Sequence, residues 1–544
     1  LFRSLTLILT LCMLLSMFPL AVGTSAADST AAYTEIGTAD ELIALMSDSS
    51  KWAGNYRLTD DIDLTGKSGQ ARIGDDTVPF TGIFDGNGKT VSGVSLNITG
   101  HVGVGFFGIV RDTEIRDLTV KGSVTSDKNF AGGMIGAVTG NALIENCTSE
   151  ITVSAPSRVG GFIGGIVLNN GLGTTAGTEL DASAGAEVIV RNCTNNGDVT
   201  GTAGRIGGVV GSASTGKTGG RSYTLENCKN TGDVTGNEAV GGVLGFTDSN
   251  TGNSGKLVGC SNSGTVKGKK SSATFVGGIA GIARLAAGTT MEITACYNEG
   301  LVTAPAQVGG ILGYAQVAGT TISKCWNAGE VKGTGTYKDG ADAGGILGIA
   351  NPVVLENCIN TGAVDGKANK NVGGIVVRNS GTNTIRYNYN GGTVTSTSAT
   401  NIRAIIGGLG SSAGTLTPNY YSVGGTDTKG TLIEAADLAN ANAYPALDNA
   451  IWLATTNGPE LHIFHKHTEP NAEGKCDTCG TNLTCTHENA TTTTVTAATC
   501  TETGVGKLVC PDCGYVEEVV LPIDPANHQA EITVALQDGK IVYT

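Results

Sequence analysis

The stretch ISKCWNAGEV at residues 322–331 recurs along the chain in close variants, and this recurrence indicates a repeat architecture. LENCKNTGDV stands at residues 225–234 and LENCINTGAV at residues 355–364. A phrase that returns every 20 to 50 residues or so is the signature of a solenoid or a propeller. Its cysteine recurs at Cys147, Cys193, Cys228, Cys260, Cys296, Cys325 and Cys358.

Other residue types keep fixed places around each cysteine. An aliphatic residue precedes it by three positions, asparagine usually follows by two, glycine by four and valine by six. A second phrase alternates with the first, as in VGGVLG at residues 240–245 and VGGILG at residues 308–313. The apolar segments are short, rich in β-branched residues and separated by turns of the Asn-Gly type, and this pattern favours strands over helices.

About three short strands per repeat predict an all-β, single-stranded parallel β-helix, because propeller blades need four strands and more aromatic residues. We expect about ten coils on a right-handed path, with the aliphatic, cysteine and valine side chains stacked inside. The asparagine should tolerate a left-handed bend, and its amide should hydrogen-bond the next coil. The glycine four residues after the cysteine should supply positive φ, and the paired glycines should allow close backbone packing.

The pattern resembles the GLUG-motif family, whose copies read roughly VGGLVGxNxGxIxNSYxxGxVxG. Residues 100–425 carry the resemblance. The chain departs from the family by placing cysteine where serine is common and by longer insertions. The resemblance implies a bacterial secreted or surface β-helix protein, often adhesin-like, or the non-catalytic part of a larger surface enzyme.

The flanking segments are interpreted as targeting and capping elements. Residues 1–27 combine a basic residue, an apolar run and small residues, which is the pattern of a secretory signal peptide; an N-terminal membrane anchor is the alternative. Residues 28–99 should form the N-terminal cap and first coils, because Thr38 and Glu41 have capping-box spacing. Residues 426–464 should form the C-terminal cap.

Seven cysteines in one inward column have three interpretations. Free thiols would pack as small apolar residues. Neighbouring coils lie about 4.8 Å apart, so adjacent cysteines could also form disulfides, which secretion favours. Metal binding or catalysis is the third interpretation, although no histidine lies nearby in the sequence to act as a base.

The residue just after the column position should point outward, and it becomes mostly aromatic in the later coils. Stacked aromatic side chains can shield a sheet or can form a platform for sugar rings or an extended partner. Insertions at about 168–186, 212–222 and 247–255 are interpreted as spacers or as recognition loops. The predicted ligand-binding stripe consists of Tyr297, Trp326, Tyr389 and Tyr420.

Cysteine and histidine become concentrated in the tail. Residues 465–528 should form two small CxxC modules of zinc-ribbon type, because a CxxC-Gly turn points two thiolates at one tetrahedral ion. The modules resemble short tandem Cys/His modules of secreted clostridial surface proteins. Structural Zn²⁺ and disulfides are the two interpretations. The candidate metal ligands are His467, Cys476, Cys479, Cys485, His487, Cys500, Cys510, Cys513 and His528.

Charge and residue distribution restrict the function. A net charge of −14 argues against nucleic acid or an anionic membrane as partner. Acidic residues are scattered: Asp198, Asp233 and Glu330 share one outward column, but other coils have no acid there. We therefore expect a non-catalytic protein; the alternative is a carbohydrate-active β-helix enzyme, a polysaccharide lyase or hydrolase.

The sequence thus predicts a secreted or cell-surface protein, a monomeric rod that binds a glycan or an extracellular protein or serves as a spacer. Residues 529–544 look like the first strands of a further β domain. We expect attachment to the bacterial cell envelope through a region outside this sequence. Beyond structural Zn²⁺ in the tail, no cofactor is expected.

Overall fold

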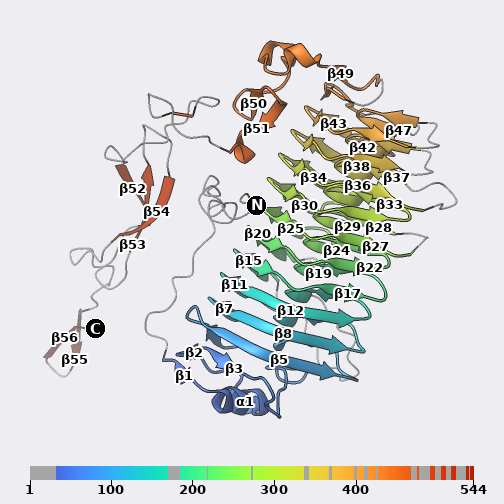
Figure 1. Cartoon of the computed structure of the whole chain (residues 1–544). Helices are drawn as coiled ribbons and strands as arrows, with labels where there is room; N and C mark the ends of the chain where they lie inside the picture. Colours follow the sequence, from blue (N-terminus) through green and yellow to red (C-terminus); the bar gives the residue numbers. More distant parts are fainter. Residues whose placement is uncertain are drawn as a thin grey trace, which may run out of the picture. The chain divides into compact units, whose positions relative to one another are not determined.

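The chain divides into two compact units. One unit is Ser25–Leu461, and the other combines His462–Thr544 with Leu1–Thr24. The first unit is the stack of coils in Figure 1. The computed structural model describes residues 32–168, 184–216, 219–270, 274–335, 342–366, 371–396, 401–409, 414–423, 427–466, 475–476, 491–496, 504–509, 516–521, 534–537 and 540–543.

A short helix closes the N-terminal end of the stack (Figure 1). It is α1 (Ala39–Ser47), which follows β1 (Thr34–Ile36). The predicted capping box is confirmed: the Thr38 side chain accepts from the Glu41 amide, and the Glu41 carboxylate accepts from the Thr38 amide at 3.0 Å. Leu45 and its buried neighbours on α1 belong to the core of the stack, so the helix covers apolar side chains that no preceding coil covers.

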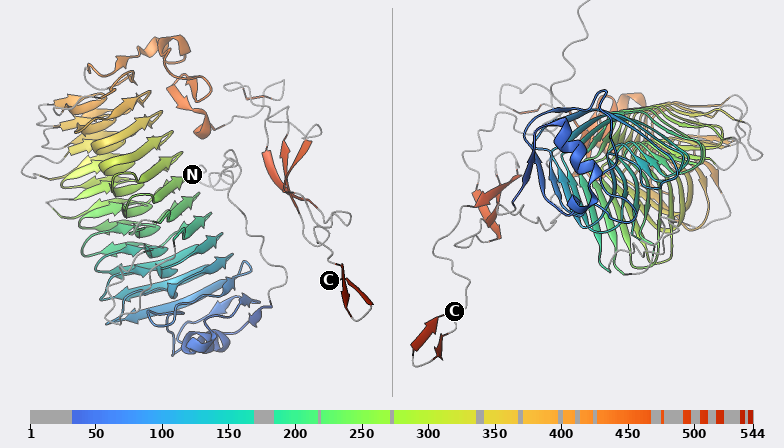
Figure 2. Two further views of the ribbon diagram at one scale, coloured as in Figure 1. Left: turned by 180° about the vertical axis from the view of Figure 1, so that it is seen from behind. Right: turned by 90° about the horizontal axis from the view of Figure 1, so that it is seen from below.

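Each coil runs around three faces, and the predicted parallel β-helix of about ten coils is confirmed. The right view of Figure 2 looks from the α1 end and shows the coils lying over one another. The expected three strands per coil become five short ones, because bends split two of the faces. In one coil they are β16 (Thr194–Asn195) and β17 (Val199–Gly201) in sheet B, β18 (Ile206–Gly207) in sheet C, and β19 (Val210–Ser214) and β20 (Ser222–Glu226) in sheet A.

Columns of equivalent side chains fill the interior. The aliphatic, cysteine and valine columns belong to one continuous buried core, as predicted. Beside them, six buried asparagines from Asn195 to Asn360 each donate from Nδ2 to Oδ1 of the asparagine in the next coil at 2.8 Å. The same Nδ2 donates to the carbonyl of the residue two positions on, so both amide protons are used. This amide ladder is Asn195, Asn230, Asn262, Asn298, Asn327, Asn360 and Asn390.

The predicted hydrogen bonds of the amide ladder are therefore confirmed, but the predicted site of the left-handed bend is wrong. The bend lies one residue before the cysteine, at Asn146 (φ 55°), Asn192 (φ 53°) and Asn357 (φ 53°) among others, and asparagine tolerates this conformation. The glycine four residues after the cysteine has no positive φ. Glycine is required at this position because the backbones of neighbouring coils approach closely: a Cβ on Gly264 would lie 2.0 Å from the carbonyl oxygen of Gly232.

The paired glycines are confirmed as places of close packing. A Cβ on Gly278 would lie 2.2 Å from the carbonyl oxygen of Gly310 and 2.4 Å from Cγ of Asn298. The second glycine of each pair thus leaves room for the amide ladder. The side chains of the ladder and the glycine backbone therefore fix each other's position.

The C-terminal end of the stack continues into a covering segment. After the last parallel strands, two 3₁₀ turns lead to an antiparallel hairpin. In the second unit the described strands are all antiparallel. The strands of these regions are β48 (Tyr420–Tyr421), β49 (Thr431–Leu432), β50 (Trp452–Thr455), β51 (Gly458–Leu461), β52 (Thr491–Thr496), β53 (Gly504–Val509), β54 (Val516–Leu521), β55 (Val534–Gln537) and β56 (Lys540–Tyr543).

Replacing Asn262 by alanine tests the amide ladder. The substitution leaves Nδ2 of Asn230 and Oδ1 of Asn298 without their partners. Because an unpaired buried polar group costs about 1–3 kcal/mol, we expect the free energy of unfolding to fall by about 3 kcal/mol in denaturant titrations followed by circular dichroism. The control Asn196→Ala, at an exposed position, should cost less than about 0.5 kcal/mol. Equal effects of the two substitutions would contradict the role of the ladder.

Candidate functional site

The seven column cysteines are buried free thiols. The thiol of Cys228 donates to the carbonyl of Val190 in the preceding coil at 3.3 Å, and that of Cys260 donates to the carbonyl of Leu225 at 3.2 Å. Burial raises the pKa of Cys193 well above the usual thiol range. Because the seven cysteines are buried and their thiols donate to backbone carbonyls, the structure supports the free-thiol interpretation of the column.

Two residues of the predicted stripe form a partly exposed aromatic pair on sheet B. The ring centroids of Tyr297 and Trp326, from neighbouring coils, lie 4.9 Å apart at an interplanar angle of 47°. The indole Nε1 of Trp326 donates to Oγ1 of Thr361 at 2.7 Å, and the hydroxyl of Tyr297 donates to Oε2 of Glu299 at 3.1 Å. Burial, and then the charge of Glu299, raise the pKa of the Tyr297 hydroxyl, so it stays neutral and remains a donor.

The other two residues of the stripe are covered, so the prediction of a four-residue exposed stripe is wrong. Only 1% of Tyr389 and 4% of Tyr420 is exposed. The reason is that the segment after β49 folds back over this flank of sheet B. The ring of Tyr420 lies 6.2 Å from that of Tyr444, and a Cβ on Gly458 would lie 2.4 Å from the hydroxyl of Tyr389.

Substitutions to serine test the difference between the covered and the partly exposed residues of the stripe. Tyr389→Ser removes a buried ring, and we expect the free energy of unfolding to fall by about 3 kcal/mol. Tyr297→Ser removes a partly exposed ring and should cost about 1 kcal/mol, mostly the lost contact with Trp326. Thermal and denaturant midpoints of the two variants measure the difference. Equal losses would mean that the covering segment does not protect Tyr389.

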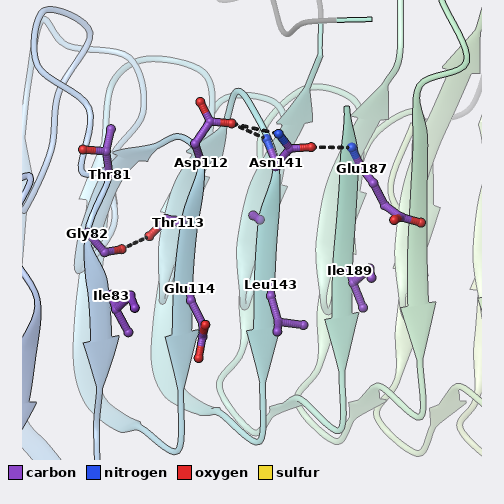
Figure 3. Close-up of a pocket in the computed structure, with 11 residues that line it drawn as sticks. Thr81, Gly82, Ile83, Asp112, Thr113, Glu114, Asn141, Leu143, Glu187 and Ile189 are labelled. Atoms are coloured by element: carbon purple, nitrogen blue, oxygen red, sulfur yellow. Dashed lines mark hydrogen bonds between the residues drawn. The ribbon is translucent and has the colours of Figure 1, made fainter. Parts of the chain in front are cut away.

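A shallow depression of about 470 Å³ lies on the outer face of sheet A near the N-terminal coils (Figure 3). Outward side chains from four successive coils line it, and Figure 3 shows Ile83, Leu143 and Ile189 on neighbouring strands with Glu114 among them. The surface therefore combines an apolar strip with acidic groups. The strands are β4 (Ile83–Asp85), β7 (Thr113–Arg116), β11 (Ala142–Glu145) and β15 (Glu187–Arg191).

Hydrogen bonds across the coils fix one rim of the depression. Oδ1 of Asp112 accepts from the backbone amide and Nδ2 of Asn141 at 3.0 and 3.1 Å, and Oδ1 of Asn141 accepts from the Glu187 amide at 3.0 Å (Figure 3). These contacts are made along the coil stack, so the rim has the regular spacing of the coils. An open surface of this kind suits contact with a large partner better than enclosure of a small molecule.

A ladder of alternating charges runs beside the depression. Asp85 lies between Arg57 at 2.8 Å and Arg116 at 3.2 Å, and Arg116 also pairs with Glu114. Burial would raise the pKa of Asp85, but hydrogen bonds from Arg57 and the charge of Arg116 outweigh it and lower the pKa. The next coils continue the alternation with Glu145 and Arg191, paired at 2.6 Å. The charged side chains of this row are therefore neutralised by ion pairs with one another.

The insertions are only partly described. Most of the insertion at 168–186 lies outside the described residues, as do residues 217–218 within the second insertion. The third insertion is a short turn between β24 (Leu244–Ser249) and β25 (Ser254–Val258). Most of this insertion therefore lies within two strands of sheet A and their connecting turn, and it does not form a long loop.

Among the described residues of the tail, Cys476 and His465 lie close together. Cys476 is buried, and its Sγ lies 3.5 Å from Nε2 of His465. Within the described residues, no group of three His, Cys, Asp or Glu side chains is placed to hold a metal ion. The predicted ligands that lie outside the described residues are His467, Cys479, Cys485, His487, Cys500, Cys510, Cys513 and His528.

The predicted signal peptide also lies outside the described residues. In the part of the chain that the structure describes, no helix has the length and apolar character needed to cross a lipid bilayer.

Comparisons with known proteins give two partial similarities. The chain is 34% identical over 149 residues to halomucin of Haloquadratum walsbyi, which covers 25% of this chain and 2% of halomucin. It is 33% identical over 105 residues to a putative Gly-rich membrane protein of Evansella cellulosilytica, which covers 18% of this chain and 12% of that protein. The chain thus spans only a small part of either relative. No family model and no solved structure matches it.

Proposed function

We propose that the chain is a secreted or cell-surface β-solenoid that serves as a structural or adhesin-like binding element and does not catalyse a reaction. The observation that carries the proposal is the way the coils are built. Stacked apolar columns and the amide ladder occupy the interior, so contacts with other molecules are left to outward side chains. The names of the two relatives, a halomucin and a putative Gly-rich membrane protein, support a place at the cell surface.

The partly exposed pair of Tyr297 and Trp326 is the best-supported contact surface on sheet B. Its two rings are held by each other and by hydrogen bonds to Thr361 and Glu299, so binding would order few side chains. Stacked rings with hydroxyl and carboxylate groups beside them suit a glycan or an extracellular protein. The resemblance to the GLUG-motif family points to the same class of surface proteins.

An array of glycans and extracellular-matrix proteins tests the binding role. The chain from residue 28 to 544 is applied beside the double variant Tyr297→Ser/Trp326→Ser and the control Val78→Ser, which changes an exposed apolar residue elsewhere. We expect a signal that the double variant lowers at least tenfold and the control leaves unchanged. Binding that is lost in neither variant would place the contact elsewhere. Cleavage of an acidic polysaccharide by the chain would contradict the non-catalytic proposal.

For the tail we propose structural Zn²⁺ held by cysteine and histidine. The bond lengths of about 2.3 Å for Zn–S and 2.0–2.1 Å for Zn–N give a ligand-to-ligand edge of about 3.5 Å in a tetrahedron. The distance between Sγ of Cys476 and Nε2 of His465 is 3.5 Å, which fits this edge. A metal would join the two chain segments that carry these residues and would stabilise a small unit with little core.

Zinc content measured by mass spectrometry tests the metal proposal. We expect bound zinc in the purified chain, and we expect Cys476→Ser to lower the zinc content. The column variant Cys260→Ala should leave it unchanged, because that thiol is buried in the coil stack. Absence of zinc, together with loss of titratable thiols under denaturing conditions, would instead establish disulfides in the tail.

A further inference from the structure

The bend between sheets C and A brings two rows of outward side chains face to face. The last glycine of the GGxxG phrase causes this close approach. A Cβ on Gly281 would lie 2.4 Å from the carbonyl oxygen of Gly245 and 2.7 Å from the amide of Val240, and Gly313 repeats the contact with Val276 one coil later. The two sheets therefore nearly touch along their backbones, and the side chains on the outside of the bend meet.

Three pairs of side chains make contact across this bend. The guanidinium of Arg205 lies over the ring of Phe246 at 4.3 Å, and Asp342 pairs with Arg378 at 2.9 Å. Between them, the rings of Phe275 and Tyr314 are stacked at 4.9 Å and 24°. Phe275 and Asp342 lie in sheet C and Arg205 lies just before its strand β18, and each of them meets a residue of the next coil on sheet A. The strands are β23 (Ala239–Gly241), β28 (Phe275–Gly277), β33 (Gln307–Gly309) and β37 (Asp342–Gly344) in sheet C, and β24, β29 (Ala280–Leu285), β34 (Leu312–Ser323) and β42 (Val376–Asn379) in sheet A.

The stacked rings of Phe275 and Tyr314 form a supported platform. Both are partly exposed, and both pack on a small buried cluster of Ala239, Phe246 and Ile282 that is separate from the core inside the coils. The platform is therefore held from below and open on its outer side. An aromatic surface of this kind packs well against the C–H face of a pyranose ring.

Gln307 lies beside the platform and carries an unmet hydrogen-bond acceptor. It is the neighbour of Phe275 in sheet C, with Asp342 on its other side. The residue is 6% exposed, and among the described residues its Oε1 has no hydrogen-bond partner. A buried acceptor without a partner is unfavourable, so a hydroxyl donor that reached it would be favoured. Register partners in a parallel sheet leave the sheet on the same side, so the side chain of Gln307 is the neighbour of the Phe275 ring.

Two oppositely charged pairs flank the platform, and Arg205 lies over Phe246 of the supporting cluster. Arg284 pairs with Asp248 at 3.4 Å on one side, and Arg378 pairs with Asp342 at 2.9 Å on the other. The site therefore offers stacking and a neutral acceptor, with charges of both signs around it. A hydroxyl-rich, uncharged ligand matches these features better than a peptide or an anionic polymer.

We propose that Phe275, Tyr314 and Gln307 form a subsite for one pyranose unit of a neutral glycan. The ring of the sugar lies on the platform, and one of its hydroxyls donates to Oε1 of Gln307. The proposal deepens the binding role proposed above and rests on it. The subsite lies at the bend of sheets C and A, whereas Tyr297 and Trp326 lie on sheet B, so either surface can fail alone.

Calorimetric titration of the chain from residue 28 to 544 tests the subsite. The probes are cellohexaose, xylohexaose and chitohexaose, with a neutral hydrophilic hexapeptide as control ligand. We expect at least one of the oligosaccharides to bind, and we expect Phe275→Ala and Tyr314→Ala to raise its Kd at least tenfold. Tyr297→Ser/Trp326→Ser should leave this Kd unchanged, which separates the subsite from the sheet B pair.

The variant Gln307→Met distinguishes ligand contact from a structural role. Methionine has a similar size but no strong acceptor, so it removes the unpaired oxygen. We expect the thermal midpoint to stay the same or rise, while the Kd of the oligosaccharide rises about fivefold. The proposal is overturned if none of the oligosaccharides binds at millimolar concentration, if the peptide binds equally well, or if the Phe275, Tyr314 and Gln307 variants bind like the unaltered chain.

Discussion

The buried amide ladder is the interaction on which the rest of the coil stack depends. Each ladder amide makes one hydrogen bond within its own turn and one to the next coil, so both its position and its orientation are specified. A shift of one residue between coils would leave these amides unpaired in the core and would turn inward side chains outward. The glycine columns also require this register between coils, because only a residue without Cβ fits where neighbouring coils touch. Apolar burial supplies most of the stability, and the amide ladder supplies the register.

The fold could be predicted from the sequence because coils that stack in register require the same residue types at the same places of each repeat. Aliphatic, cysteine and valine columns recur at constant offsets, and each of them lies in the core. The roles of glycine and of the left-handed residue were assigned wrongly, because sequence shows that a position excludes a Cβ but not why. At Gly264 the reason is a backbone oxygen 2.0 Å away, and the positive φ belongs to residues such as Asn192 before the cysteine.

The candidate sites were harder to predict, since they depend on contacts that have no fixed period. Tyr389 and Tyr420 continue the column of Tyr297 and Trp326, but a segment from beyond the last coil covers them. The pair of Phe275 and Tyr314 joins different coils and different sheets, and other coils carry other residues at these places. The sequence signal for this pair was the recurring GGxxG phrase with aromatic residues just outside it. The phrase can be recognised as a bend between sheets C and A only when the backbone contacts are known.

Hydrogen exchange of the asparagine side-chain amides, measured by NMR with selectively labelled asparagine, tests whether the amide ladder holds the coils in register. In the structure both amide protons of Asn230, Asn262 and Asn298 are engaged inside the core, whereas Asn196 is exposed. We expect the ladder amides to exchange at least a thousandfold more slowly than Asn196, and to exchange together as coils open. Ladder amides that exchange as fast as Asn196 would show that the coils are not held in register by this ladder.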